Sequence, residues 1–120
     1  MSKGALDLFG RILMTKVRDK AVVDWRKIVD GSMKGEMAEK NHDALASFSE
    51  GQRKVFLSLV PSVVDTVLHH LLWTLEQQQD VAIHIRVDGE DVQDLKEISD
   101  GLPGELYSTE GWIARFSGVE

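Results

Sequence analysis

The stretch from Val55 to Leu75, VFLSLVPSVVDTVLHHLLWTL, constrains the fold more than any other part of the chain. Thirteen of its twenty-one residues are Val, Leu, Phe or Trp, and no glycine interrupts it. At about 100° per residue, most of these side chains gather on one broad helical face. That face consists of Phe56, Leu57, Val60, Val64, Val67, Leu68, Leu71 and Leu75. Val63 and Leu72 widen it beyond what a surface helix needs, so the sequence predicts a central helix wrapped by the rest of the chain.

A capping motif and one proline set the limits of this helix. The motif SEGQ at residues 49–52 matches a capping box, so we expect the helix to begin near Glu50. Pro61 lies about three turns inside, where it removes one backbone hydrogen bond and crowds the preceding turn. The sequence therefore predicts a kink or a short break near Val60, with the helix resuming through Gln78.

Three weaker helical segments precede the central helix. Apolar residues at three-to-four spacing predict helices over Ala5–Val17 and Asp19–Asp30, and nothing between them decides whether the two are continuous. Gly10 weakens the first by about 1 kcal/mol relative to alanine. Gly31 should end the second, because glycine readily takes the left-handed conformation at a helix end. A third helix is predicted over Lys34–Ser47.

The hydrophobic period changes after Gln79. Val81–Val87 alternates apolar with smaller or polar residues, as a half-buried strand does, and a turn at residues 88–89 follows. A helical turn is predicted around Asp94–Ile98, and short strands over Glu105–Ser108 and Trp112–Phe116. The predicted fold is α+β, with helices packed around one long, Pro-kinked central helix and followed by a small antiparallel sheet.

Length and composition fit one soluble domain. The chain has 120 residues, 42% of them hydrophobic, which is enough to bury a core without the support of disulfides or a structural metal. We expect a single domain over residues 1–120, with a helical part at about 4–79 and a sheet part at about 80–117. The absence of cysteine excludes disulfides, thiolate metal ligands and a cysteine nucleophile.

Two observations favour a cytoplasmic protein that does not enter a membrane. The amino terminus lacks the small-residue cleavage site of a signal peptide, and Asp7 and Arg11 break its apolar run. The central helix has the length of a membrane span, yet Asp65 at its middle would cost about 2.5–3.5 kcal/mol on insertion. A buried helix in a soluble protein is the less costly interpretation.

Negative charge is concentrated at the carboxy-terminal end. Residues 80–120 carry three Lys or Arg against ten Asp or Glu, whereas residues 1–79 are nearly neutral. Such an end disfavours nucleic acid and would steer a basic protein partner, although it also serves solubility alone. The residues predicted to meet a partner are three acids and two apolar side chains expected at the surface. They are Asp91, Asp94, Glu97, Leu102 and Tyr107.

The polar side of the central helix is the best candidate for chemistry. Asp65 and His69 are four residues apart, so the carboxylate could orient the imidazole or both could bind one cation. His42 and Asp43 could join them on a divalent metal if the third and fourth helices pack side by side. The competing interpretation is a solvated stripe with a local ion pair, since paired groups mark functional sites only in a minority of cases.

The common catalytic and nucleotide-binding motifs are absent. The chain contains no GxxxxGK[ST], GxGxxG, HExxH or GxSxG sequence, and no basic stripe with interleaved aromatic residues. The leading hypothesis is a non-catalytic protein-interaction module that presents an acidic carboxy-terminal region and needs no cofactor. The alternative is a small metal-dependent enzyme or metal-binding protein. Self-association is compatible with both, since dimers are the commonest oligomers.

Overall fold

The first part of the protein is one long helix, seen in a computed structural model that describes residues 2–119. α1 (Ser2–Ile12) passes into a short π-helical segment, η1 (Leu13–Arg18), and then into α2 (Asp19–Asp30) without a break. The two helices predicted from the sequence are therefore continuous. Gly31 ends α2 in the left-handed conformation, with φ of 82°, as predicted.

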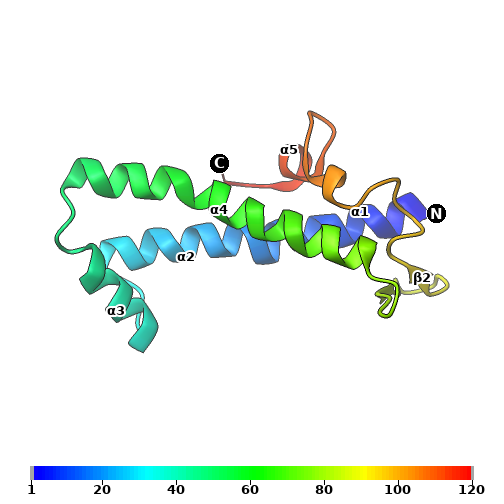
Figure 1. Ribbon diagram of the computed structural model, residues 1–120, viewed down its shortest axis with the longest axis horizontal. Helices are drawn as coiled ribbons and strands as arrows, with labels where there is room; N and C mark the ends of the chain where they lie inside the picture. The colour runs from blue at the N-terminus through cyan, green and yellow to red at the C-terminus, as the bar shows by residue number, and fades with distance from the viewer. Residues whose placement is uncertain (1, 120) are drawn as a thin grey trace.

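The chain then turns through α3 (Glu36–Leu45) and returns along the first helix as α4 (Glu50–Gln77). Figure 1 shows that the long first helix and α4 run in opposite directions, with α3 projecting at the end where they are joined. α4 stays helical through Pro61, so the predicted break does not occur. Its two halves run at an angle to each other in Figure 1, as expected for a proline inside a helix.

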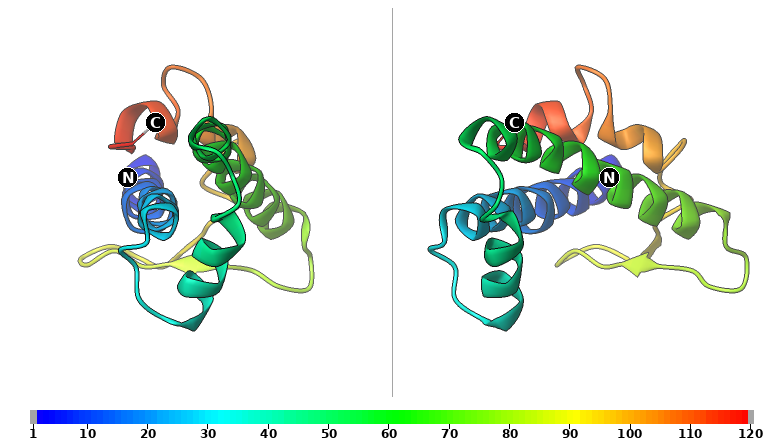
Figure 2. Two further views of the ribbon diagram at one scale, coloured as in Figure 1. Left: turned by 90° about the vertical axis from the view of Figure 1, so that its left-hand side faces the viewer. Right: turned by 60° about the vertical axis from the view of Figure 1, so that its left-hand side comes forward.

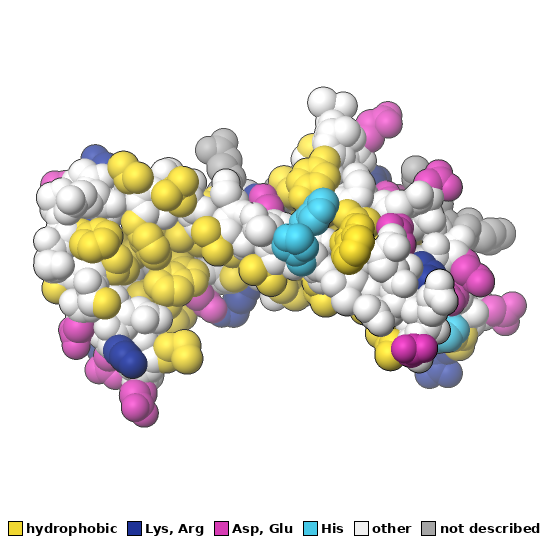
Figure 3. Space-filling view, in the orientation of Figure 1, with side chains coloured by type: hydrophobic (Ala, Val, Ile, Leu, Met, Phe, Trp, Pro, Cys, Tyr) yellow, Lys and Arg dark blue, Asp and Glu magenta, His cyan; other side chains and the backbone are white. Residues whose placement is uncertain are grey.

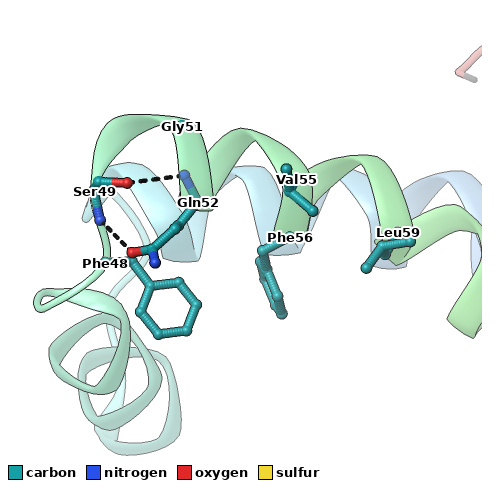
Figure 4. A pocket seen from close by; sticks show the side chains of 7 residues that line it. All are labelled: Phe48, Ser49, Gly51, Gln52, Val55, Phe56 and Leu59. Carbon is teal, nitrogen blue, oxygen red and sulfur yellow. Dashed lines mark hydrogen bonds between the residues drawn. The ribbon is translucent and has the colours of Figure 1, made fainter.

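The predicted capping box is confirmed. The backbone N–H of Gln52 donates to the Ser49 hydroxyl at 3.2 Å, and the N–H of Ser49 donates to the Gln52 side chain at 2.8 Å (Figure 4). Two backbone donors that would otherwise lack partners at the start of α4 are thus satisfied by these two residues.

Replacing Ser49 by alanine should lower the free energy of unfolding by about 1 kcal/mol, because the N–H of Gln52 loses its acceptor. Urea unfolding followed by circular dichroism measures the change. Ser47→Ala is the matched control, since Ser47 is exposed in the preceding turn and caps no helix. Equal losses in the two variants would contradict a role for the cap.

The carboxy-terminal segment contains less sheet than the sequence predicted. β1 (His84–Ile85) pairs antiparallel with β2 (Gln93–Asp94), so only two residues of the predicted Val81–Val87 strand are paired. A turn follows β2 at residues 95–97 in place of a helical turn beginning at Asp94. The α+β class with a long central helix and a small antiparallel sheet is nevertheless confirmed.

Two predicted strands are wrong. The segment from Glu105 to Ser108 overlaps η2 (Pro103–Leu106), a short 3-10 helix, and the segment from Trp112 to Phe116 is the helix α5 (Trp112–Phe116). In α5, Trp112 and Phe116 are four residues apart and so lie on one side of the helix, which packs against α1 and η1. A strand of the same five residues would place Ile113 and Arg115 on the opposite face from Trp112.

The main core lies where α1, η1 and the second half of α4 meet the carboxy-terminal segment. Figures 1 and 2 show α5 and η2 over this half of the helical pair, while α3 lies beside the other end. The buried members of the core are Leu6, Leu13, Met14, Leu68, Leu72, Leu95, Leu102, Leu106 and Trp112. The carboxy-terminal segment therefore covers one side of the second half of α4, while another side of the helix stays exposed along both halves.

Candidate functional site

Asp65 and His69 contact two different segments of the chain. Both carboxylate oxygens of Asp65 accept from Arg18, with Nε at 2.6 Å from Oδ1 and Nη2 at 3.2 Å from Oδ2. His69 Nδ1 lies 3.0 Å from the Tyr107 hydroxyl. Partial burial raises the pKa of Tyr107 above its ordinary value, and the charge of Asp65 raises it further, so the hydroxyl stays protonated at neutral pH. These polar residues fasten η1 and the carboxy-terminal segment to α4.

His42 and Asp43 lie away from that pair. His42 Nδ1 donates to the carbonyl oxygen of Ile28 at 2.9 Å, which satisfies an acceptor at the end of α2, while Asp43 is exposed on α3. Within residues 2–119, no three His, Asp or Glu side chains lie close enough together to hold a metal ion. The structure therefore does not bring the two predicted pairs together, and metal binding by Asp65 with His69 alone stays a prediction.

The three acids predicted to meet a partner lie around the small sheet. Asp91 and Glu97 are exposed, whereas Asp94 is half-buried and accepts the backbone N–H of Lys96 at 3.1 Å. Lys96 in turn donates from Nζ to the carbonyl of Gln78 at 2.8 Å. Asp94 thus has a structural contact, and Asp91 and Glu97 remain accessible.

The two apolar residues predicted at this surface differ in exposure. Tyr107 is 44% exposed, as expected, but Leu102 is fully buried, so that prediction is wrong. The cause is a contact that the sequence did not reveal. Glu76 Oε2 accepts the backbone N–H of Leu102 at 2.7 Å and holds the start of η2 against α4, which places Leu102 in the core.

The largest unexpected feature is an exposed apolar stripe along α4. Its members recur every four residues, and each is between 46% and 63% exposed. We call this stripe the α4 face; it consists of Val55, Leu59, Val63, Val67 and Leu71. The sequence prediction that Val67 and Leu71 are buried is therefore wrong. The sequence shows that α4 is apolar on more than one side, but the positions of side chains around a helix do not show which side the rest of the chain covers.

The α4 face carries no formal charge. Between Lys54 and Glu76, α4 has a single Asp or Glu and no Lys or Arg, and that one acid, Asp65, is paired with Arg18. The exposed polar residues that form a parallel stripe beside the α4 face are Ser58, Ser62, Thr66, His70 and Thr74. Figure 3 shows hydrophobic side chains gathered over the first half of α4 and reaching the middle of the molecule. Depletion of charge around a contiguous apolar patch is typical of the core of a protein interface.

A hollow of about 560 Å³ opens at the amino-terminal end of the α4 face (Figure 4). Phe56 forms one wall and packs edge-on against Trp25, with ring centroids 5.5 Å apart. The described residues that line the hollow carry no titratable side chain; they are Phe48, Ser49, Gly51, Gln52, Val55, Phe56 and Leu59. The hollow is suited to an apolar side chain and offers no group for acid–base chemistry.

The dimensions of the molecule agree with an incompletely covered helix. Its radius of gyration is 17.0 Å, whereas a compact domain of this length has a radius of about 13.6 Å. Its solvent-accessible surface is 7967 Å², about 1,500 Å² more than a folded monomer of this mass exposes. The excess is of the size that one subunit buries in an obligate homodimer, about 1,000–2,500 Å².

In comparisons with known proteins, no family model, curated protein or solved structure matches the chain. The α4 face combines exposed apolar side chains, an absence of charged residues and an adjoining hollow.

Proposed function

We propose that the protein is a non-catalytic protein-interaction module and that a second protein chain covers its α4 face. The observation that carries this proposal is an uncharged apolar stripe, about half exposed, that continues from Val55 to Leu71. Removing such a surface from water contributes about 25 cal/mol per Å² of apolar area, which is the main favourable term in most protein association.

A protein fits this face better than a lipid bilayer does. α4 is long and apolar enough to cross a membrane, and only 17% of its most apolar window is buried. However, Asp65 and Arg18 form an ion pair near its middle, and charges at that depth are costly in a membrane. Helices that lie on a membrane carry Lys and Arg on their polar side, which α4 lacks between Lys54 and Gln77. The net charge of −6 also disfavours anionic lipid.

The acidic segment is the second part of this proposal. Asp91 and Glu97 are exposed and flank β2 in the sequence. The small sheet lies at the opposite end of the molecule from α3 and the start of α4 (Figure 1). The charge of these two acids would steer a basic partner toward this end and raise its rate of association. The protein would then hold one partner by apolar contact and attract another by charge.

The absence of cysteine allows a direct test of whether the α4 face is covered. In an extract of the producing cells, we expect the thiol of Val63→Cys to react with a maleimide at least ten times more slowly than that of Ser62→Cys. Ser62 is the matched control because it is exposed on the same turn but points about 100° away around the helix.

Equal rates for the two thiols in the extract would contradict the proposal. Protection of Val63→Cys that disappears once membranes have been removed by centrifugation would also contradict it, because lipid would then be the covering material. Retained protection in the cleared extract would support a protein partner.

A further inference from the structure

We propose that the chain covering the α4 face is a second copy of this protein, with the two α4 helices packed antiparallel about a two-fold axis at Val63. This inference rests on the proposed function, because it identifies the protein that covers the face. The charge of the face and the order and spacing of its side chains support a self-complementary contact, and the exposed area of the whole molecule agrees with it.

The charge distribution permits the face to meet its own copy. A two-fold axis brings every residue near the axis opposite an identical patch, so any charge on the face would meet like charge. The α4 face has none, and the nearest acid, Asp65, is turned toward Arg18. A surface selected for a different, charged partner would carry complementary charges, which are missing here.

The order of side chains matches an antiparallel pairing centred on Val63, the middle member of the stripe. In that register Val55 lies opposite Leu71 of the second copy, and Leu59 lies opposite its Val67. Every leucine thus meets a valine, which lets large and small side chains interdigitate. An axis one half-turn further along, at residue 65, would place Leu59 opposite Leu71 and leave Val55 at the edge.

The spacing also suits a standard geometry of helix packing. Residues four apart form a ridge inclined to the helix axis, and two such ridges interdigitate when helices cross at about −50° with axes about 8–10 Å apart. Val63 at the crossing point is small enough for this approach. Leu71 of the second copy then lies beside Val55, at the mouth of the hollow that Phe48 and Phe56 line.

The exposed surface of the whole molecule agrees with a dimer. The chain exposes 7967 Å², and its excess of about 1,500 Å² over a compact monomer falls within the roughly 1,000–2,500 Å² that one subunit buries in an obligate homodimer. Contact along the α4 face would cover the side of this helix that its own chain leaves exposed.

The register can be tested with cysteine variants of the purified protein under mild oxidation. We expect Val63→Cys to form an intermolecular disulfide with its own copy, whereas Val55→Cys and Leu71→Cys should each stay reduced when alone. A mixture of Val55→Cys and Leu71→Cys protein should be linked by a short bis-maleimide, because helices that cross at about −50° diverge by several ångströms two turns from the crossing point. The test is specific because a disulfide requires Cα atoms about 4.4–6.8 Å apart. Cross-linking of Val55→Cys with itself and not of Val63→Cys would overturn the register.

Sedimentation equilibrium tests the dimer itself. We expect the unmodified protein to be dimeric at micromolar concentration, and Val63→Asp to dimerise at least about 100-fold more weakly because two unpaired carboxylates would be buried together. Ser62→Asp, with the same charge beside the face, should remain dimeric. Circular dichroism verifies that both variants are folded, and the cross-linking result does not depend on either of them.

These outcomes separate the two proposals. The purified protein could be monomeric at about 100 µM while Val63→Cys is protected in the cleared extract. This result would refute self-association and would support a different protein as the partner. A monomer whose Val63→Cys thiol is unprotected in the extract would overturn both. A dimer that persists unchanged in Val63→Asp would overturn the α4 face as the dimer interface.

Discussion

Replacing Arg18 by alanine should lower the free energy of unfolding by about 3–5 kcal/mol, a cost typical of breaking a buried ion pair from one side. Arg18 is only 3% exposed, although it is a charged residue. It lies at the end of η1, and its guanidinium donates to both oxygens of Asp65. The hydrogen bond that Arg18 donates to Asp65 raises the pKa of Arg18 against the opposing effect of burial, so the side chain remains charged in the folded protein.

Arg18 also holds the end of the chain. Its Nη1 donates to the Ser117 hydroxyl at 2.9 Å and to the Val119 carbonyl at 3.1 Å. Asp19 accepts from the same hydroxyl at 2.7 Å and from the Gly118 N–H at 2.7 Å. Removing the guanidinium leaves the carboxylate of Asp65 without its paired charge. It also removes the hydrogen bonds from Arg18 to Ser117 and Val119 that help to hold the last residues against η1.

Urea unfolding at neutral pH measures this loss. Arg115→Ala is the matched control. Arg115 also donates through two nitrogens to one carboxylate, the carboxylate of Asp7, but this pair lies at the surface. Exposed pairs contribute about 0–1 kcal/mol, so the control should lose far less stability. Arg18→Ala combined with Asp65→Ala should be less destabilised than the sum of the two single variants, because each single change leaves the other group unpaired. Losses that are equal for Arg18→Ala and Arg115→Ala would refute the assignment.

The parts of the fold that the sequence predicted are those specified by neighbouring residues. The start of α4 depends on Ser49 and Gln52, three residues apart, and the end of α2 depends on Gly31 itself. The length of α4 follows from a stretch rich in apolar residues that no glycine interrupts. Each of these signals acts over one or two turns, so it can be recognised without knowledge of the tertiary structure.

The parts that could not be predicted are set by contacts between distant residues. Glu76 holds the N–H of Leu102, and Trp112 packs against Gly10, so the carboxy-terminal segment is shaped by the helices beneath it. Its short apolar runs are equally compatible with a strand or a helix. For this reason α5 was predicted as a strand and Leu102 as an exposed residue.

The candidate site divides in the same way. The spacing of Asp65 and His69 correctly placed two polar groups on one side of α4, but their partners, Arg18 and Tyr107, are far away in the sequence. Val63, Val67 and Leu71 are predicted as core residues because the positions of side chains around a helix reveal polarity and not coverage. The central helix is apolar on nearly every side, and the rest of the described chain leaves the α4 face exposed.

Replacing Gly10 by alanine should destabilise the protein by about 2–3 kcal/mol, although the same change in an isolated helix would stabilise it by about 1 kcal/mol. Gly10 is buried in α1, and the indole of Trp112 lies directly on it. A methyl group at Gly10 would clash with Cε2 of Trp112. Trp112 is fully buried and packs edge-on against Phe9 with centroids 5.9 Å apart, so its ring has no room to retreat.

Thermal and urea unfolding of two glycine variants in the same helix separate packing from helix propensity. Gly4→Ala is the control, because a methyl group there meets no atom within 4 Å; it should leave stability unchanged or raise it by up to about 1 kcal/mol. In a Trp112→Leu background, which opens space above α1, Gly10→Ala should lose its penalty and give the small gain expected from propensity. If Gly10→Ala stabilises the unmodified protein as Gly4→Ala does, Trp112 does not pack against Gly10, and the contact between α5 and α1 is refuted.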